Sequence, residues 1–232
     1  MKRFFGRREG ERIIFEGGEA QHIARVLRMG AGDKVIASTN DESDYYCTLT
    51  EVGKNKAVAT IDETKKCPAL PRKEISLFIS MPKREYFETI VTKAVELGAS
   101  DIQPFISQFS VNHDFKRERT EQIVMTACKQ CERSKLVPAG DVISFDKMLS
   151  RLADYDMVIF ANEHAGVAPF PQDLKKYDKI AVVVGCEGGF SEVEAEQIIK
   201  AGAKSISLGA RILRCDTACL ATLALVNLLS GN

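Results

Sequence analysis

The chain has 232 residues, 45% of them hydrophobic and 28% charged, and its formal net charge at pH 7 is zero. This composition is that of an ordinary globular protein and excludes a disordered or fibrous chain. Zero net charge also argues against binding nucleic acid through bulk charge, so such binding would depend on local clusters of basic residues.

Membrane, export and disulfide signals are weak in this sequence. No apolar run reaches the roughly 18 residues that a spanning helix needs, and the basic start of the chain lacks the apolar core of a signal peptide. The seven cysteines are odd in number and scattered, which predicts no disulfide framework. Cys128-x-x-Cys131 has no second pair nearby, so packing is favoured over a zinc or redox site. We expect a cytoplasmic protein that uses no metal.

Residues 1–66 have the pattern of a small all-β domain. Several short strand-like runs are separated by turn-forming Gly, Asn and Asp, which indicates a small β-barrel. The predicted strands are 13–15, 34–37, 45–52 and 57–61, with a helical segment at 21–29. Residues 67–73 contain two prolines and no periodicity, which is typical of a linker.

Residues 74–232 alternate between strand and helix patterns, which predicts an α/β domain with a mostly parallel sheet. Two strands are continuous apolar runs, as expected where helices cover both faces of a sheet. Ser191 and Glu194 form a capping box at the start of one helix. The predicted strands are 75–80, 102–106, 157–161, 180–184 and 205–208, and the predicted helices are 85–97, 117–134, 192–201 and 218–229.

The segment 182–191 combines a strand, a glycine-bearing turn and a helix start. Ligands bind beyond the carboxyl ends of strands in open α/β sheets, and glycine lets the backbone approach a ligand closely. A tight strand-to-helix turn without a ligand is the alternative. The spacing Gly185-x-x-Gly188-Gly189 differs from the dinucleotide pattern, and the Glu187 carboxylate would repel a pyrophosphate.

A second loop, 207–217, also follows a predicted strand. Ile212 and Leu213 are large apolar residues in a loop that should be polar, so we expect them to cover a ligand such as an adenine ring. Arg211 and Arg214 flank them. The following helix, 218–229, is apolar nearly all round and must be buried in a core or between subunits.

Basic residues gather at the start of the chain. Arg25 and Arg28 follow shortly after this cluster, and an ordinary solvated surface explains it as well as a nucleic-acid site does. Residues 1–12 contain two acidic residues against five basic ones: Lys2, Arg3, Arg7, Arg8 and Arg12.

Several segments spread over both predicted domains match one family pattern in order and spacing. They are Arg3-Phe4-Phe5, His22-Ile23-x-x-Val26-Leu27-Arg28, Gly32-Asp33, Lys93-Ala94-x-Glu96-Leu97-Gly98, Gln130-Cys131-x-Arg133 with Val137-Pro138, Glu187-Gly188-Gly189-Phe190-Ser191-x-x-Glu194, and Leu208-Gly209-x-Arg211-Ile212-Leu213-Arg214-x-x-Thr217-Ala218. Through these segments the chain resembles, over essentially its whole length, the SPOUT-class RNA methyltransferases. It looks closest to the bacterial enzymes that form N3-methyluridine in 16S ribosomal RNA.

The chain departs from the usual family pattern at five positions. Cys186 and Ala210 stand where proline is usual, and Cys215 and Asp216 replace Thr and Glu. Phe109 occupies a position where arginine is common. Asp216 keeps a carboxylate but is one methylene shorter, which weakens the case for a direct catalytic role.

The resemblance implies a PUA-like RNA-binding barrel at 1–66 and a SPOUT domain at 74–232 whose chain is tied in a trefoil knot. It also implies a homodimer that binds S-adenosylmethionine and methylates N3 of a uridine in 16S ribosomal RNA or the small ribosomal subunit (uracil 1498 in the usual numbering of that RNA).

Site residues are carried over from the resemblance in three groups. Arg214, Glu187 and Asp216 are the catalytic candidates, with Arg214 stabilising a uracil anion and a carboxylate or water taking the proton. The cofactor-binding candidates are Ala161, Asn162, Glu163, Gly185, Cys186, Glu187, Gly188, Leu208, Gly209, Ile212, Leu213, Arg214, Thr217 and Ala218. The RNA-binding candidates are Arg3, Arg7, His22, Arg25, Arg28, Lys93 and Arg133; His113 is given no role.

Three alternatives stay open at this point. The chain could be a related methyltransferase acting on another ribosomal or transfer RNA position. It could be an RNA-binding protein without activity, or a nicotinamide-dependent oxidoreductase, although the last lacks the expected glycine pattern. For Arg214, an ion pair with Asp216 or Glu187 is as plausible as a catalytic role.

Overall fold

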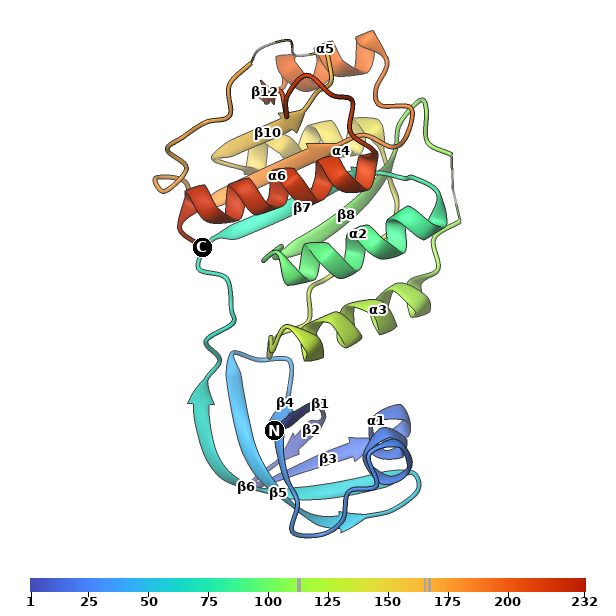
Figure 1. Ribbon diagram of the computed structural model, residues 1–232, viewed down its shortest axis with the longest axis vertical. Coiled ribbons are helices and arrows are strands. Elements are labelled where there is room, and N and C mark those ends of the chain that lie inside the picture. Colours follow the sequence, from blue (N-terminus) through green and yellow to red (C-terminus); the bar gives the residue numbers. More distant parts are fainter. Residues whose placement is uncertain (112–113, 165, 167) are drawn as a thin grey trace. The chain divides into compact units, whose positions relative to one another are not determined.

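The structure is a computed structural model that describes residues 1–111, 114–164, 166 and 168–232 (Figure 1). His113 therefore lies outside the described residues. The chain divides into two compact units. Unit 1 contains residues 1–70 and 128–136, and unit 2 contains residues 71–127 and 137–232.

Unit 1 is built on one six-stranded sheet that curls into a half-barrel. The first two strands occupy opposite edges of this sheet although only Gly6 separates them in sequence, so the sheet must curl for both to form. A Cβ on Gly6 would lie 2.6 Å from Ile13 Cγ2, which explains glycine at this corner. The sheet order is β1 (Lys2–Phe5), β4 (Lys34–Ser38), β5 (Ser43–Val52), β6 (Lys56–Lys66), β3 (Arg12–Glu16) and β2 (Arg7–Glu9).

The helical segment of unit 1 differs from the one predicted at 21–29. Helix α1 (Gly17–Gln21) begins earlier and continues into a π-helical turn (His22–Val26). Arg28 then has a φ of +53°, in the left-handed region, which ends the helix before the predicted boundary.

Segment 128–136 belongs to unit 1 although it lies far along the chain. Lys129 Nζ pairs with Glu19 Oε1 at 2.6 Å, and the side chains are only 18% and 14% exposed. Ser134 Oγ donates to the Asp41 carbonyl at 2.9 Å. Through these contacts segment 128–136 packs on the half-barrel. The predicted first domain, 1–66, did not include this segment.

Unit 2 contains a six-stranded sheet in which every strand pair is parallel, where a mostly parallel sheet of five strands was predicted. Along β11 the side chains of Ala181 and Val183 join a core on one face that also contains Met148 of α4 and Ile198 of α5. Helices α2 and α6 contact each other and lie together on one side of the sheet (Figure 1). The strand order is β12 (Lys204–Ile206), β10 (Met157–Ala161), β11 (Lys179–Val184), β7 (Glu74–Ser80), β8 (Asp101–Ile106) and β9 (Ile143–Ser144).

The helices of unit 2 follow the predicted order, with one addition. The helices are α2 (Arg84–Glu96), α3 (Arg117–Gln130, of which residues 128–130 belong to unit 1), α4 (Phe145–Arg151), α5 (Glu192–Lys200) and α6 (Cys215–Ser230), and a short 3₁₀ turn (Leu152–Asp154) follows α4. Strand β9 and helix α4 were not predicted. The capping box is present at α5: Ser191 Oγ accepts from Glu194 N at 3.3 Å, and the Glu194 carboxylate accepts from Ser191 N at 3.1 Å.

Within the described residues, no helix is long and apolar enough to span a bilayer. The seven cysteines all lie in this part of the chain, and none of them forms a disulfide. The trefoil knot implied by the resemblance stays a prediction.

Candidate functional site

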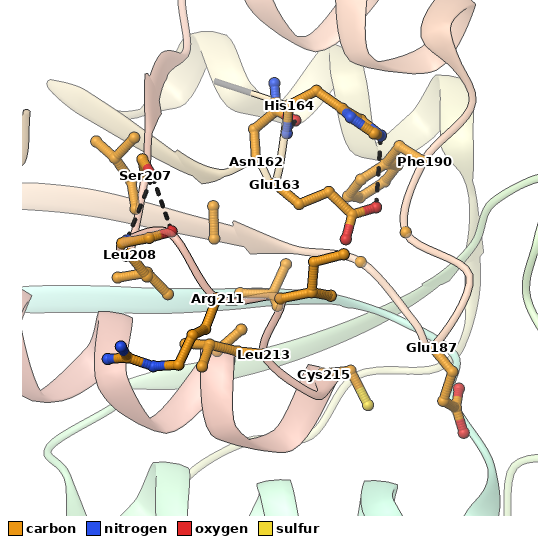
Figure 2. A pocket seen from close by; sticks show the side chains of 18 of the residues that line it. Asn162, Glu163, His164, Glu187, Phe190, Ser207, Leu208, Arg211, Leu213 and Cys215 are labelled. Atoms are coloured by element: carbon orange, nitrogen blue, oxygen red, sulfur yellow. Dashed lines mark hydrogen bonds and ion pairs between the residues drawn. The ribbon is translucent and has the colours of Figure 1, made fainter. Parts of the chain in front are cut away.

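A pocket lies at the carboxyl ends of β10, β11 and β12, three neighbouring strands of the parallel sheet. In sheets of this kind the carboxyl edge is where ligands bind, because the loops that leave it diverge. Figure 2 shows side chains from all three loops directed into this space. The pocket is lined by the following predicted cofactor residues: Ala161, Asn162, Glu163, Gly185, Cys186, Glu187, Leu208, Gly209, Ile212, Leu213 and Ala218.

The predicted cofactor residues and the residues that line this pocket overlap in part. Three predicted residues, Gly188, Arg214 and Thr217, do not contribute to its lining. The following residues line it without having been predicted: His164, Val184, Gly189, Phe190, Ile206, Ser207, Ala210, Arg211 and Cys215. Most of them are immediate neighbours of predicted positions, so taking each loop as a continuous segment would have found them.

The turn after β11 is tight. A tight turn is compatible with both interpretations of segment 182–191, the one with a bound ligand and the one without. Gly189 N donates to the Cys186 carbonyl at 3.0 Å. A Cβ on Gly185 would lie 3.0 Å from the Gly189 Cα, and one on Gly189, whose φ is +66°, would lie 2.7 Å from Glu163 Oε1. Glycine at 185 and 189 therefore allows the turn to close against the neighbouring loop.

Gly188 faces away from this contact. A Cβ placed on it would lie 2.8 Å from the Phe109 Cβ. A side chain at position 188 would therefore clash with the loop after β8.

Glu187 links the turn to the start of α2. Its Oε1 accepts the Lys83 backbone N–H at 3.0 Å, and Lys83 is the N-cap residue of α2. The carboxylate thus satisfies a helix-terminal donor and lies where the helix dipole favours negative charge. Figure 2 shows this carboxylate turned away from Glu163 and His164.

The loop after β12 combines a polar turn with exposed apolar side chains. Ser207 Oγ accepts from Gly209 N at 3.3 Å, and Gly209 has a φ of +111°. The Ile212 side chain is 84% exposed. Covering this apolar side chain with a ligand or another chain would be favourable, because it removes apolar surface from water.

The loop after β10 forms the third wall. Asn162 Nδ2 donates to Ser205 Oγ at 3.2 Å, and Asn162 Oδ1 accepts from His164 N at 3.0 Å. Glu163 Oε1 and His164 Nε2 lie 3.5 Å apart, a contact that is an ion pair when the imidazole is protonated. Asn162 therefore joins the loop after β10 to strand β12.

Arg214 and Asp216 stand at the amino terminus of α6. Arg214 Nη1 lies 3.4 Å from the Tyr86 hydroxyl, and among the described residues no ion pair joins it to Asp216 or Glu187. Asp216 Oδ1 accepts the Thr217 N–H at 2.8 Å within the first helical turn. Burial, followed by the charges of Glu187 and Asp216, raises the pKa of the Cys215 thiol to about 12. This thiol is therefore protonated at neutral pH and is part of the pocket wall rather than a nucleophile.

Comparison with known families decides what kind of protein has this pocket. Residues 68–227 match the family described as "RNA methyltransferase domain", and residues 15–62 match the "RNA methyltransferase PUA domain". The chain belongs to the RNA methyltransferase family.

Three proteins are similar to this chain over nearly its whole length. It is 32% identical to the ribosomal RNA small subunit methyltransferase E of Bacillus subtilis, over 94% of this chain and 91% of that protein. The crystal structure of the enzyme of the same name from Neisseria gonorrhoeae, bound to S-adenosyl methionine, is 27% identical with a TM-score of 0.90, covering 99% of this chain and 98% of that one. A predicted RNA methyltransferase from Thermotoga maritima is 26% identical with a TM-score of 0.77, covering 98% of each chain.

The seven RNA-binding candidates differ in their exposure. Arg7, Arg25 and Arg28 are exposed on unit 1, and Arg7 contacts Glu9. His22 is half-buried, with its ring edge-on to Phe4 at 5.8 Å between centroids.

The remaining candidates are paired or buried. Lys93 is half-buried and pairs with Glu96 at 2.8 Å. Arg133 is only 5% exposed, and its burial lowers the pKa of the guanidinium. Arg3 is 8% exposed and forms a bidentate pair with Asp44 at 2.5 and 2.9 Å. The positions of Arg3 and Arg133 argue against direct phosphate contacts by either residue, because a buried guanidinium cannot reach a phosphate in solvent.

Proposed function

We propose that this protein transfers a methyl group from S-adenosylmethionine to N3 of a uridine in 16S ribosomal RNA, at uracil 1498 as the resemblance implies. The pocket at the carboxyl ends of β10, β11 and β12 carries this proposal, since it lies in a chain matched over nearly its whole length by small-subunit ribosomal RNA methyltransferases. Ribosomal RNA as substrate also supports a cytoplasmic location.

The residues of the pocket fit S-adenosylmethionine better than a phosphate-bearing cofactor. Glu163 and Glu187 are both among the lining residues, and negative charge beside the pocket would repel a pyrophosphate and tolerate a sulfonium cation. Ile212 and Leu213 offer apolar surface for an adenine ring, and the glycines at 185 and 189 bring backbone groups close to the space. These pocket-lining residues are our candidates for holding the cofactor.

The reaction needs an activated nitrogen, since uridine N3 carries a proton at neutral pH. When bound, the cofactor supplies an already activated methyl group. The protein must hold N3 in line with that group, and such positioning supplies the largest part of the rate gain.

Arg214 is suited to stabilising the developing negative charge on the uracil oxygens. Its guanidinium stays charged and offers several donors, and the Tyr86 hydroxyl at 3.4 Å holds it at the amino terminus of α6. Glu187, Asp216 or water accepts the N3 proton. Glu187 already accepts a hydrogen bond from Lys83 N, and Asp216 accepts one from Thr217 N. Because both carboxylates already have a backbone partner, we favour water as the acceptor of the N3 proton.

Unit 1 supplies the RNA-binding surface in this proposal. Its match to a PUA domain of RNA methyltransferases supports this role. Arg7, Arg25 and Arg28 are the exposed guanidinium groups among the candidates, and each phosphate contact they make should steepen the salt dependence of binding.

We also propose that the protein acts as a homodimer through α6. Ala224, Leu225 and Leu228 leave an apolar strip exposed on this helix, and Leu228 is 74% exposed. Exposed apolar surface on a helix that follows directly from the pocket loop favours burial against a second subunit. Sedimentation of the wild type and of Leu228→Asp tests this, because a wild type that sediments as a monomer contradicts it.

Mass spectrometry of ribosomal RNA nucleosides tests the reaction. Small subunits from a strain lacking the gene are incubated with the protein and labelled S-adenosylmethionine, and labelled N3-methyluridine is expected. Label in a different nucleoside would contradict the substrate assignment and favour a related methyltransferase activity. Calorimetry without any cofactor binding would favour the inactive RNA-binding alternative.

A further inference from the structure

An aromatic ring is exposed beside the turn that forms the pocket wall. Phe109, in the loop after β8, is 42% exposed, and it is the one aromatic among the exposed large apolar residues of the described chain. Gly188 lies next to it, at a distance of 2.8 Å between a Cβ built on the glycine and the Phe109 Cβ. The residues on either side of Gly188, Glu187 and Gly189, line the pocket.

The loop that carries Phe109 is held firmly, so the exposure of the ring does not come from a loose segment. The Gln108 N–H donates to Glu194 Oε1 at 2.7 Å, and Cys186 Sγ donates to the Phe109 carbonyl at 2.9 Å. The Ser107 N–H donates to Ser110 Oγ at 2.9 Å. The backbone around the ring is therefore attached to the cofactor turn and to the start of α5, while the ring stays partly exposed.

Polar groups suited to uracil border the same turn. Glu187 accepts from Lys83 N at the start of α2, and three residues after Lys83 the Tyr86 hydroxyl lies 3.4 Å from Arg214 Nη1. The turn thus has an aromatic face on one side, at Phe109, and hydrogen-bonding groups of α2 and α6 nearby.

We infer that the ring of Phe109 is the surface on which the target base stacks when it leaves its RNA strand. This inference rests on the proposed function and adds a residue that binds the substrate. An enzyme that modifies N3 needs the pairing edge of the base to be free, either in an unpaired strand or after the base is extruded. Stacking lost on extrusion is replaced most directly by an aromatic side chain. An aromatic side chain on a backbone that is already hydrogen-bonded to the cofactor turn provides such a surface.

The sequence offers a direct probe, because the chain contains no tryptophan. In Phe109→Trp the new residue is the sole tryptophan, and stacking of a base on it should quench its fluorescence. Ile199→Trp is the matched control, since Ile199 is 45% exposed at the far end of α5. Titration with an RNA hairpin carrying the target uridine should quench tryptophan at 109 and not at 199. Equal quenching in both variants, or quenching that persists when the target nucleotide is abasic, would overturn the inference.

Kinetics separate this inference from the proposed function. Phe109→Leu should raise KM for RNA on the order of tenfold, while the affinity for S-adenosylmethionine stays at the wild-type value and Phe109→Tyr retains the wild-type KM. If the wild type methylates RNA and Phe109→Leu keeps its KM, the inference alone fails. If the wild type transfers no methyl group, the proposed function fails, and the fluorescence titration still decides whether a base stacks on residue 109.

Discussion

The Arg3–Asp44 pair allows a sharp test of whether a basic residue near the start of the chain binds RNA or holds the fold. The two side chains are 5% and 4% exposed and form a bidentate contact, and Arg3 Nη1 also donates to Ser38 Oγ at 2.7 Å. We predict that Arg3→Met destabilises unit 1, because it leaves the Asp44 carboxylate buried without a positive partner.

The size of the effect follows from the burial. Removing one partner of a buried ion pair costs about 3–5 kcal/mol, a large share of the roughly 5–15 kcal/mol that stabilises a domain. With a urea dependence of about 1–3 kcal/mol/M, the unfolding midpoint of unit 1 should fall by at least about 1 M. Replacing both partners, in Arg3→Met with Asp44→Leu, should restore most of the loss, since a buried pair contributes little beyond an apolar substitute.

Urea denaturation followed by circular dichroism measures the midpoint, and hydrogen exchange of peptides from β4 and β5 assigns the change to unit 1. Arg7→Met is the matched control: Arg7 is 60% exposed, so removing its contact with Glu9 should cost no more than about 1 kcal/mol. If Arg3→Met unfolds at the wild-type urea concentration and only its RNA affinity drops, Arg3 is an RNA contact and the structural assignment is wrong.

Further predictions concern the pocket and the RNA surface. Tyr86→Phe should lower kcat severalfold with cofactor affinity unchanged, because the hydroxyl beside Arg214 is lost; steady-state kinetics showing a change only in KM would contradict this positioning role. Gly188→Val should shift the loop that carries Phe109 and raise KM for RNA more than Kd for S-adenosylmethionine, and calorimetry showing complete loss of cofactor binding would instead place residue 188 inside the pocket. Arg28→Glu should weaken RNA binding on the order of tenfold with unchanged cofactor affinity, and filter binding at two salt concentrations should show a shallower salt dependence.

The parallel sheet of unit 2 could be predicted because its signals are local. The apolar run of β11 (Lys179–Val184) and the capping box of Ser191 and Glu194 each lie within ten residues, and both are present. The short edge strands β1 and β2 were missed, since three or four residues are too few for a period to show. Their pairing depends on Gly6 and the curl of the sheet, which only the folded chain defines.

The prediction of the pocket had the same limit. Segments around Glu187 and Ile212 were recognised because each loop follows its own strand, and sheet topology brings the loops together. Lys83 and Phe109 lie in the segments after β7 and β8, and nothing in their local sequence indicates that they meet the turn after β11. Contacts between distant segments require the tertiary fold.

The charged residues near the pocket show why residue type alone does not give a role. Glu187 and Asp216 both accept backbone N–H groups at helix amino termini, where a carboxylate stabilises the helix whether or not it takes part in catalysis. Arg214, in contrast, has the Tyr86 hydroxyl as its hydrogen-bond partner among the described residues and keeps most donors of its guanidinium available. A side chain that already pairs with a helix terminus is less available to bind the substrate. For this reason we propose Arg214, rather than Glu187 or Asp216, as the first catalytic candidate to test.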